Sequence, residues 1–164
     1  MTIGRALLGL GLLGACDGGP DVSPHPCASP ELGLEVAPPG GDYGDLTDGG
    51  ELWTGIPPQG GAPYSPFRVR LEGPADLFDG IDVRMAVTEG DEVVADDTIP
   101  MRLVCANVGE SAGRWVGSEV HLIYTGHSLE DLSGRDVNVT VTVNGGADGE
   151  LEVSAHGRAT LVVD

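Results

Sequence analysis

One serine of this chain stands in the sequence pattern that many catalytic serines occupy. Residues Gly109 to Gly113 read Gly-Glu-Ser-Ala-Gly, a Gly-x-Ser-x-Gly pattern around Ser111, and Asp136 and His156 follow in the order acid, then base. In such a pattern a strand turns sharply into a helix, which exposes the serine hydroxyl to a neighbouring imidazole. The chemistry that the pattern predicts is hydrolysis through a covalent intermediate on Ser111.

The residues that follow Ser111 favour a simple turn. Arg114-Trp115-Val116-Gly117 leads into another alternating stretch, so no helix fits behind the serine. The short remainder of the chain cannot supply the rest of a hydrolase domain, and 27 glycines make a chance match easy. We therefore expect a non-catalytic chain, and a secreted serine hydrolase that uses Ser111 is the alternative.

Two runs of acidic residues have a spacing that suits a hard cation. Each run places a carboxylate at every third position of a turn-rich stretch, and the members are Asp42, Asp45, Asp48 and Glu51, then Asp76, Asp79 and Asp82. Carboxylates on a loop are ligands for Ca²⁺. Neither run has EF-hand spacing, because Gly44 and Leu46 stand at the third and fifth positions from Asp42. We expect solvated turns without metal or cofactor, and a calcium-dependent module using the Asp42–Glu51 loop is the alternative.

A few further side chains could recognise a ligand. His121 and His127 flank the end of an alternating stretch, but a third ligand at metal-binding spacing is missing from their neighbourhood in the sequence. Trp53, Tyr64 and Phe67 surround a Pro/Gly-rich stretch and would suit the floor of a carbohydrate or peptide groove. Aromatic residues are only 4% of the chain, so we expect these three to be used in packing.

The first fifteen residues have the layout of a secretory signal peptide. Arg5 precedes an apolar run, Ala6 to Ala15, that contains only Ala, Leu and Gly. As a helix this run would extend about 15 Å, roughly half of a hydrocarbon core, which is too short to span a membrane. We expect residues 1–15 to direct export.

The end of this run, Leu13-Gly14-Ala15-Cys16, resembles the lipobox of bacterial lipoproteins. The resemblance implies cleavage before Cys16, a diacylglyceryl group on its thiol and acylation of the new amine. Two or more acyl chains hold a protein firmly on a membrane. The implied location is the bacterial cell envelope, facing the periplasm or the exterior, and the membrane leaflet stays open. An ordinary signal peptide with a chance cysteine is the alternative.

Charge and cysteine content limit the partners and the compartment. The net charge is −18, which disfavours nucleic acid and anionic headgroups and leaves an envelope protein or a polysaccharide as possible partners. With Cys16 lipidated, Cys27 and Cys105 remain, and outside the cytoplasm we expect them to form a disulfide. The bridge would close a loop of about 80 residues, contribute roughly 4 kcal/mol and attach the tether to a core strand. Two free thiols are the alternative.

The chain divides into a signal peptide (1–15), a lipidated and Pro/Gly-rich tether (16–30) and a β domain (31–164). From Phe67 onward apolar and polar residues alternate, most clearly from Val137 to Val143, and Gly-rich turns separate the alternating stretches. One apolar and one polar face predict an antiparallel β-sandwich of about 7–9 strands. We expect separate strands over 92–95 and 101–105, and a final hairpin through His156-Gly157.

Two further resemblances refine the expected class. The stretch Leu129 to Val143, with the corner Leu132-Ser133-Gly134, resembles bacterial immunoglobulin-like modules, which implies an immunoglobulin-like sandwich. The Cys–Trp–Cys core of antibody domains is missing from the sequence, so the strand order stays open. Residues 58–61, Pro-Gln-Gly-Gly, are similar to myxobacterial lipoproteins of no known activity. The expected function is a membrane-anchored extracytoplasmic lipoprotein whose non-catalytic domain binds a partner or has a structural role.

Overall fold

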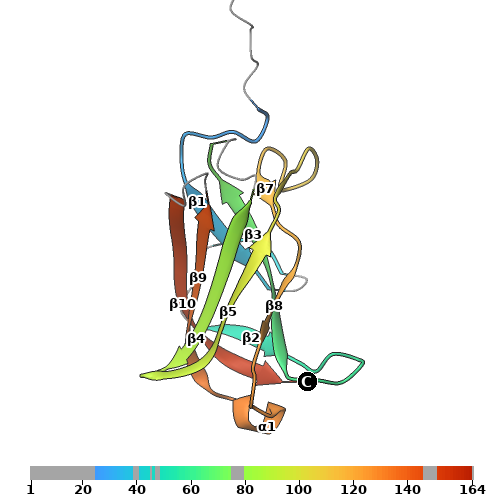
Figure 1. The fold of residues 1–164 in the computed structure, drawn as a ribbon, viewed down its shortest axis with the longest axis vertical. Coiled ribbons are helices and arrows are strands. Elements are labelled where there is room, and N and C mark those ends of the chain that lie inside the picture. The colour runs from blue at the N-terminus through green and yellow to red at the C-terminus, as the bar shows by residue number, and fades with distance from the viewer. Residues whose placement is uncertain are drawn as a thin grey trace, which may run out of the picture.

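The computed structural model describes residues 25–38, 41–44, 46, 49–74, 80–145 and 151–163, and the described chain is almost entirely β-structure (Figure 1). Among these residues a single helical turn interrupts the strands. The elements are β1 (Gly33–Ala37), β2 (Gly50–Thr54), β3 (Tyr64–Glu72), β4 (Ile81–Glu89), β5 (Glu92–Met101), β6 (Val104–Cys105), β7 (Trp115–Val116), β8 (Val120–Ile123), α1 (Leu129–Leu132), β9 (Asp136–Gly145) and β10 (Leu151–Val163).

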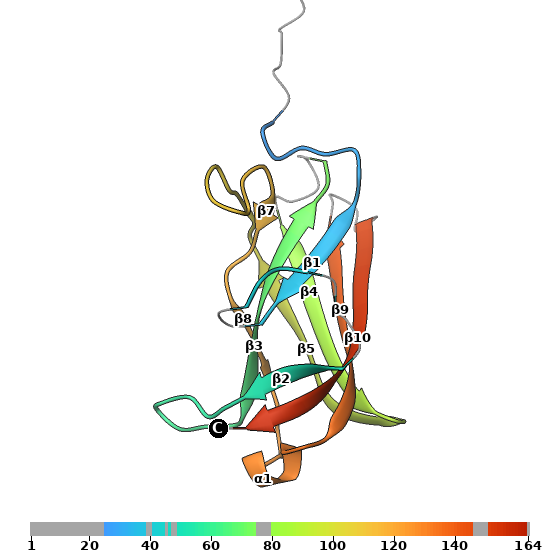
Figure 2. The same cartoon turned by 180° about the vertical axis from the view of Figure 1, so that it is seen from behind.

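The strands form two sheets that pack face to face as a sandwich (Figures 1 and 2). The first sheet has the order β1-β3-β7-β6, with β8 also paired to β3, and the second has the order β2-β10-β9-β4-β5. The β2–β10 pair is parallel and the other strand pairs are antiparallel. The all-β sandwich that the alternation predicts is therefore confirmed.

The described strands number ten because one strand is broken in two. β8 pairs with Tyr64 to Phe67 of β3, and β7 pairs with Arg70 and Leu71 further along the same edge. The break includes Gly117, where an added Cβ would lie 2.1 Å from the Met101 sulfur. With β7 and β8 counted as one strand, the first sheet, β1-β3-β7-β6, has the A-B-E-D order of an immunoglobulin-like sandwich. In the second sheet, β10-β9-β4-β5 has the G-F-C-C′ order, and β2 is added beside β10.

Two expected strand boundaries are wrong. β10 runs unbroken from Leu151 to Val163, so no hairpin forms at His156-Gly157. A Cβ at Gly157 would lie 3.0 Å from backbone and side-chain carbons of Leu46, so this glycine admits a neighbouring segment instead of making a turn. β5 continues through Asp96 and Asp97, because an edge strand exposes acidic side chains to solvent.

The core lies between the sheets and is mostly aliphatic. Along β9 the inward residues are buried and their neighbours are not, as alternation requires. The largest fully buried side chains include Tyr124, Phe67, Leu71, Met85, Leu122, Leu132 and Leu161. Their burial supplies the main stabilisation of the fold, because apolar area removed from water contributes about 25 cal/mol per Å².

A chain of buried hydroxyl groups joins the two sheets. Thr54 Oγ1 lies 3.0 Å from Ser65 Oγ, which lies 2.9 Å from the hydroxyl of Tyr124. All three residues are fully buried, and burial raises the pKa of the Tyr124 hydroxyl. Each hydroxyl therefore has a partner away from water, which avoids the cost of an unsatisfied buried polar group.

The turn α1 forms the corner between β8 and β9. Ser128 and Asp131 make a capping box, and the hydrogen bonds from Ser128 lower the pKa of the Asp131 carboxyl. Arg135 follows and pairs with Glu89 and Glu92, with Nε lying 2.6 Å from Glu89 Oε2. These ion pairs attach the β4–β5 turn to the corner. The sandwich end that carries α1 is called the far end, and the end that carries residues 25–32 and β7 is called the tether end (Figure 1).

Candidate functional site

The cysteine pair lies at the tether end. Cys27 and Cys105 form a disulfide with their Cα atoms 5.7 Å apart, as the sequence analysis expects. Cys105 belongs to β6, a two-residue edge strand, and not to a core strand as expected. The ring of His25 stacks on Trp115 at 4.8 Å, and the Ser29 N–H donates to Gly73 O. Residues 25–29, which the sequence predicts to be part of the tether, are therefore attached to the sandwich.

The proposed anchor lies outside the described residues. This applies to Cys16, to the signal peptide at 1–15 and to the tether up to residue 24. Within the described ranges, no helix is long and apolar enough to cross a membrane. The lipid anchor therefore stays a prediction of the sequence.

Ser111 lies in the turn between β6 and β7. Gly109 and Gly113 flank it with positive φ angles of 76° and 78°, and the Arg114 N–H donates to Ser111 O at 3.0 Å. The strand β7 begins at Trp115, so no helix follows the serine. Ser111 Oγ accepts a hydrogen bond from Arg70 Nη1 at 3.3 Å. Its side chain therefore contacts a cation and not a general base.

Asp136 and His156 are separated from Ser111 and from each other. In the β9–β10 register, Asp136 lies opposite Thr160, and His156 lies opposite Thr140. These positions are four residues apart, or about 13 Å along a strand. Each side chain has a local partner, since Thr160 Oγ1 donates to Asp136 and Thr140 Oγ1 lies 3.1 Å from His156 Nδ1. β6 and β7 belong to the other sheet, so the fold does not assemble this triad.

The acidic runs do not form a metal centre in the part of the chain that is described. Asp42 and Glu51 are described, and Asp82 is exposed on β4, while Asp45, Asp48, Asp76 and Asp79 lie outside the described residues. Among the described residues, no group of three or more His, Cys, Asp or Glu side chains is placed to hold a metal ion. The histidine His121 instead contacts Glu119, with Nε2 3.1 Å from Oε1.

An ion-pair network covers the outer face of the first sheet near the tether end. Arg70 Nε lies 2.6 Å from Glu35 Oε2, and Arg114 pairs with Glu72 and lies 3.7 Å from Glu35. The hydrogen bond from Arg70 lowers the pKa of the Glu35 carboxyl. The ring of Tyr43 lies against Arg70, whose Cζ is 4.5 Å from the ring centre. These contacts hold residues 41–44 on the sheet.

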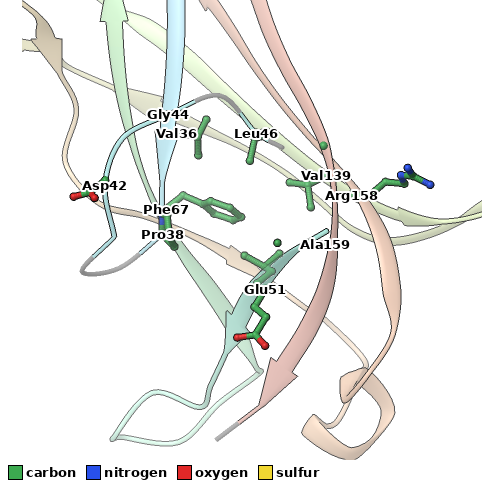
Figure 3. Close-up of a pocket in the computed structure, with 13 residues that line it drawn as sticks. Val36, Pro38, Asp42, Gly44, Leu46, Glu51, Phe67, Val139, Arg158 and Ala159 are labelled. Atoms are coloured by element: carbon green, nitrogen blue, oxygen red, sulfur yellow. The ribbon is translucent and has the colours of Figure 1, made fainter. Parts of the chain in front are cut away.

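A pocket of about 340 Å³ lies between the sheets, beside the crossing from β1 to β2. Its apolar lining comes from both sheets and from the crossing segment, and comprises Val36, Leu46, Leu52, Phe67, Val139 and Ala159. Figure 3 shows Val36, Leu46 and Phe67 pointing into a common space, whereas the charged ends of Glu51 and Arg158 point away from it. The pocket can therefore hold an uncharged apolar group.

The chain path explains why the pocket exists. β1 belongs to the first sheet and β2 to the second, so the segment between them must cross the open edge of the sandwich. Val36 and Gly44 exchange two backbone hydrogen bonds, of 2.9 and 3.2 Å, which fold the crossing segment back over the edge. Gly157 leaves room for Leu46. This pocket was not predicted from the sequence, although a glycine inside an alternating strand indicates the close approach of another segment.

The three aromatic residues that the sequence grouped together are divided by the fold. Phe67 faces inward and lines the pocket. Trp53 and Tyr64 are partly exposed and make an edge contact, with ring centres 5.8 Å apart. The expected packing role therefore applies to Phe67, and the other two rings lie at the surface.

Comparisons of the sequence with protein-family models and with curated proteins give no match. The fold class accordingly comes from the strand order of the structure.

Proposed function

We propose that this chain is a lipid-anchored protein of the bacterial cell envelope, facing the periplasm or the exterior, whose β-sandwich binds a ligand without catalysis. The observation that carries this proposal is the Cys27–Cys105 disulfide. Disulfides persist in oxidising compartments, which agrees with export directed by the signal-like residues 1–15. The bridge also attaches the domain directly behind Cys16, the residue that the lipobox resemblance assigns to the lipid.

The pocket between the sheets supports a binding role. Its volume of about 340 Å³ is in the range of small-molecule sites. Apolar side chains such as Val36, Leu52 and Phe67 line its interior, and Asp42, Glu51 and Arg158 lie at its rim. The charged groups at its rim point away from the interior (Figure 3). The proposed ligand is therefore a small uncharged apolar molecule, or an apolar group of a larger partner. A hydrolase is not proposed, because Ser111 contacts Arg70 and lies apart from His156.

Mass spectrometry of the mature protein tests the anchor. The full chain is expressed in a bacterial host that processes lipoproteins, and we expect a mature start at Cys16 with a diacylglyceryl group and an acylated amine. The Cys16→Ser variant is the matched control and should carry no lipid. An intact Met1, or a mature start at Cys16 without fatty acids, would refute the anchor.

Titration with N-phenyl-1-naphthylamine, an uncharged apolar dye, tests the pocket. The full-length Cys16→Ser chain should bind the dye saturably, with enhanced fluorescence. Ala159→Leu should weaken binding about tenfold, because added methyl groups occupy the pocket. Ala86→Leu, on the outer face of β4, is the matched control and should bind as the parent does. Equal binding by both variants would remove the pocket from the proposal.

A further inference from the structure

A row of apolar and aromatic side chains crosses four strands on the outside of the far end. This row is called the aromatic belt, and its members are Val162 of β10, Trp53 of β2, Tyr64 of β3, and His121 and Ile123 of β8. Val162 is the register partner of Trp53, and Tyr64 is the register partner of Ile123. The belt is continuous because the isolated bridge between Gly55 and Tyr64 brings β2 beside β3 at this corner.

Strand alternation turns these side chains outward. On β2, Leu52 and Thr54 are buried, so Trp53 between them faces the outside. On β8, Val120 and Leu122 are buried, so His121 and Ile123 face the outside. Ile123 is 46% exposed and the His121 side chain is 51% exposed. The belt is therefore a surface feature built by rigid strands and not part of the core.

The rings of the belt are held in place by one another and by the backbone. Trp53 and Tyr64 meet edge to face at 86°, and the centres of the Tyr64 and His121 rings are 4.6 Å apart. A Cβ at Gly55 would lie 2.4 Å from Trp53 Cη2, so the indole rests directly on this glycine. Trp53 also lines a shallow surface depression with Pro38, Glu51 and Val162. These constraints reduce the entropy that the rings would lose on binding.

The polar groups beside the belt are acidic. Glu51 lies two residues before Trp53 on the same outer side of β2, and Glu119 lies 3.1 Å from the His121 ring. Carboxylates accept hydrogen bonds from hydroxyl groups, and aromatic rings pack against the apolar C–H faces of pyranose rings. The net charge of −18 repels anionic polymers. Together these features match an uncharged, hydroxyl-rich chain that can lie along a surface.

We infer that the aromatic belt is a docking surface for a neutral polysaccharide. The belt lies at the far end, away from residues 25–32, where the chain enters the sandwich (Figures 1 and 2). A domain anchored through Cys16 would therefore present the belt away from the anchor. This inference deepens the proposed function and rests on it for the direction in which the belt faces, while the chemistry of the belt is independent of the pocket.

Affinity electrophoresis tests this inference. The full-length Cys16→Ser chain is run in native gels that contain dextran, laminarin, galactomannan or the acidic polysaccharide alginate. We expect at least one neutral polysaccharide to retard migration and alginate to have no such effect. Retardation by alginate alone, or by none of the polysaccharides, would overturn the inference.

Matched variants locate the binding surface. Trp53→Ala and His121→Ala should each weaken retardation about fivefold, because each removes a ring of the belt. Val104→Ala and Val108→Ala are the controls, since these side chains are 63% and 82% exposed near the tether end. His121 is exposed, so its variant keeps the test valid even where loss of Trp53 lowers stability. Equal retardation of belt and control variants would overturn the inference.

These outcomes are separable from those of the proposed function. If the chain is lipidated at Cys16 and binds the apolar dye but binds no neutral polysaccharide, only the inference about the belt is refuted. If the chain carries no lipid but still binds polysaccharide through Trp53, only the proposal of a lipid anchor is refuted.

Discussion

The disulfide at the tether end and the buried hydroxyl chain near the far end join parts of the sandwich by different kinds of bond. At the tether end, the Cys27–Cys105 disulfide and the Arg70–Glu35 ion pair connect segments that are far apart in sequence. Near the far end, Thr54, Ser65 and Tyr124 join the sheets through neutral, buried hydrogen bonds. The connections at the tether end therefore depend on redox state and pH, whereas the buried hydroxyl chain near the far end depends on neither.

Short strands explain why the first sheet needs a covalent bridge at the tether end. β6 and β7 contain two residues each, and residues 25–32 form no strand, so the tether end has few ladder hydrogen bonds to offset the entropy of ordering. Ordering the backbone costs about 1–2 kcal/mol per residue. A covalent bridge reduces this cost by restricting the unfolded chain. The second sheet has strands of nine to thirteen residues in β4, β5, β9 and β10, which run along the sandwich (Figure 1).

The largest effect is expected from removing the disulfide. The double variant Cys27→Ser and Cys105→Ser should lower the free energy of unfolding by roughly 4 kcal/mol, because the bridge closes a long loop. Urea denaturation measures this loss, and a reducing agent should produce it in the parent chain. Amide hydrogen exchange should rise first in residues 25–29, β6 and β7. Equal increases at both ends would contradict the division between them.

A smaller effect is expected from the buried hydroxyl chain. Tyr124→Phe should lower the free energy of unfolding by about 1–2 kcal/mol, because Ser65 loses one partner but keeps Thr54. The loss should be the same from pH 4 to pH 8 and with or without a reducing agent. Thr140→Val removes a hydroxyl on the exposed face of β9 and is the control, with an expected change within about 0.5 kcal/mol. A pH-dependent loss in Tyr124→Phe would contradict the comparison.

A similar but pH-dependent effect is expected at the tether end. Arg70 lowers the pKa of Glu35, so the ionised carboxylate stabilises the fold above its unfolded pKa, and this contribution is lost as the pH falls through the lowered folded pKa. Glu35→Gln should cost roughly 1 kcal/mol at pH 7. The difference in melting temperature between the parent and Glu35→Gln should shrink from pH 6 to pH 3. A constant difference would show that the ion pair does not act through charge.

The smallest effect is expected from an exposed pair at neither end. Arg84 on β4 donates two hydrogen bonds to Asp96 on β5, which lowers the pKa of the Asp96 carboxyl. The Arg84 side chain is 56% exposed, so water and salt screen the pair. Arg84→Ala should therefore change the free energy of unfolding by less than Glu35→Gln does. A loss equal to that of Glu35→Gln would mean that burial does not distinguish these two pairs.

The alternation of residues predicts which parts of the chain form strands, and it succeeds where strands are long. The alternating stretch from Val137 to Val143 lies inside β9, and the one from Ile81 to Val87 lies inside β4. The alternation fails to predict the strand boundary where packing against a neighbouring segment determines the local structure. Gly157 resembles a turn residue in sequence, but in the fold it lies in mid-strand beneath Leu46.

The candidate sites were less predictable than the strands. The pattern around Ser111 suggests a nucleophile, yet its meaning depends on whether a helix follows and whether a histidine lies nearby. Trp53, Tyr64 and Phe67 are close in sequence, but the alternation of side chains along β2 and β3 places Phe67 on the inner face and the other two on the outer face. The local sequence does not specify which strand of the other sheet lies beside a given residue.

By itself the sequence determined the all-β class and the inward and outward faces of the long strands, and it predicted the Cys27–Cys105 pair that the structure contains. The tertiary structure alone decided the parallel pairing of β2 with β10, the pocket beneath the β1–β2 crossing and the assembly of the aromatic belt. The physical reason is the separation in sequence between the residues that interact. A period of two is set by the geometry of a single strand, whereas sheet order and pockets arise from contacts between segments that are distant in the chain.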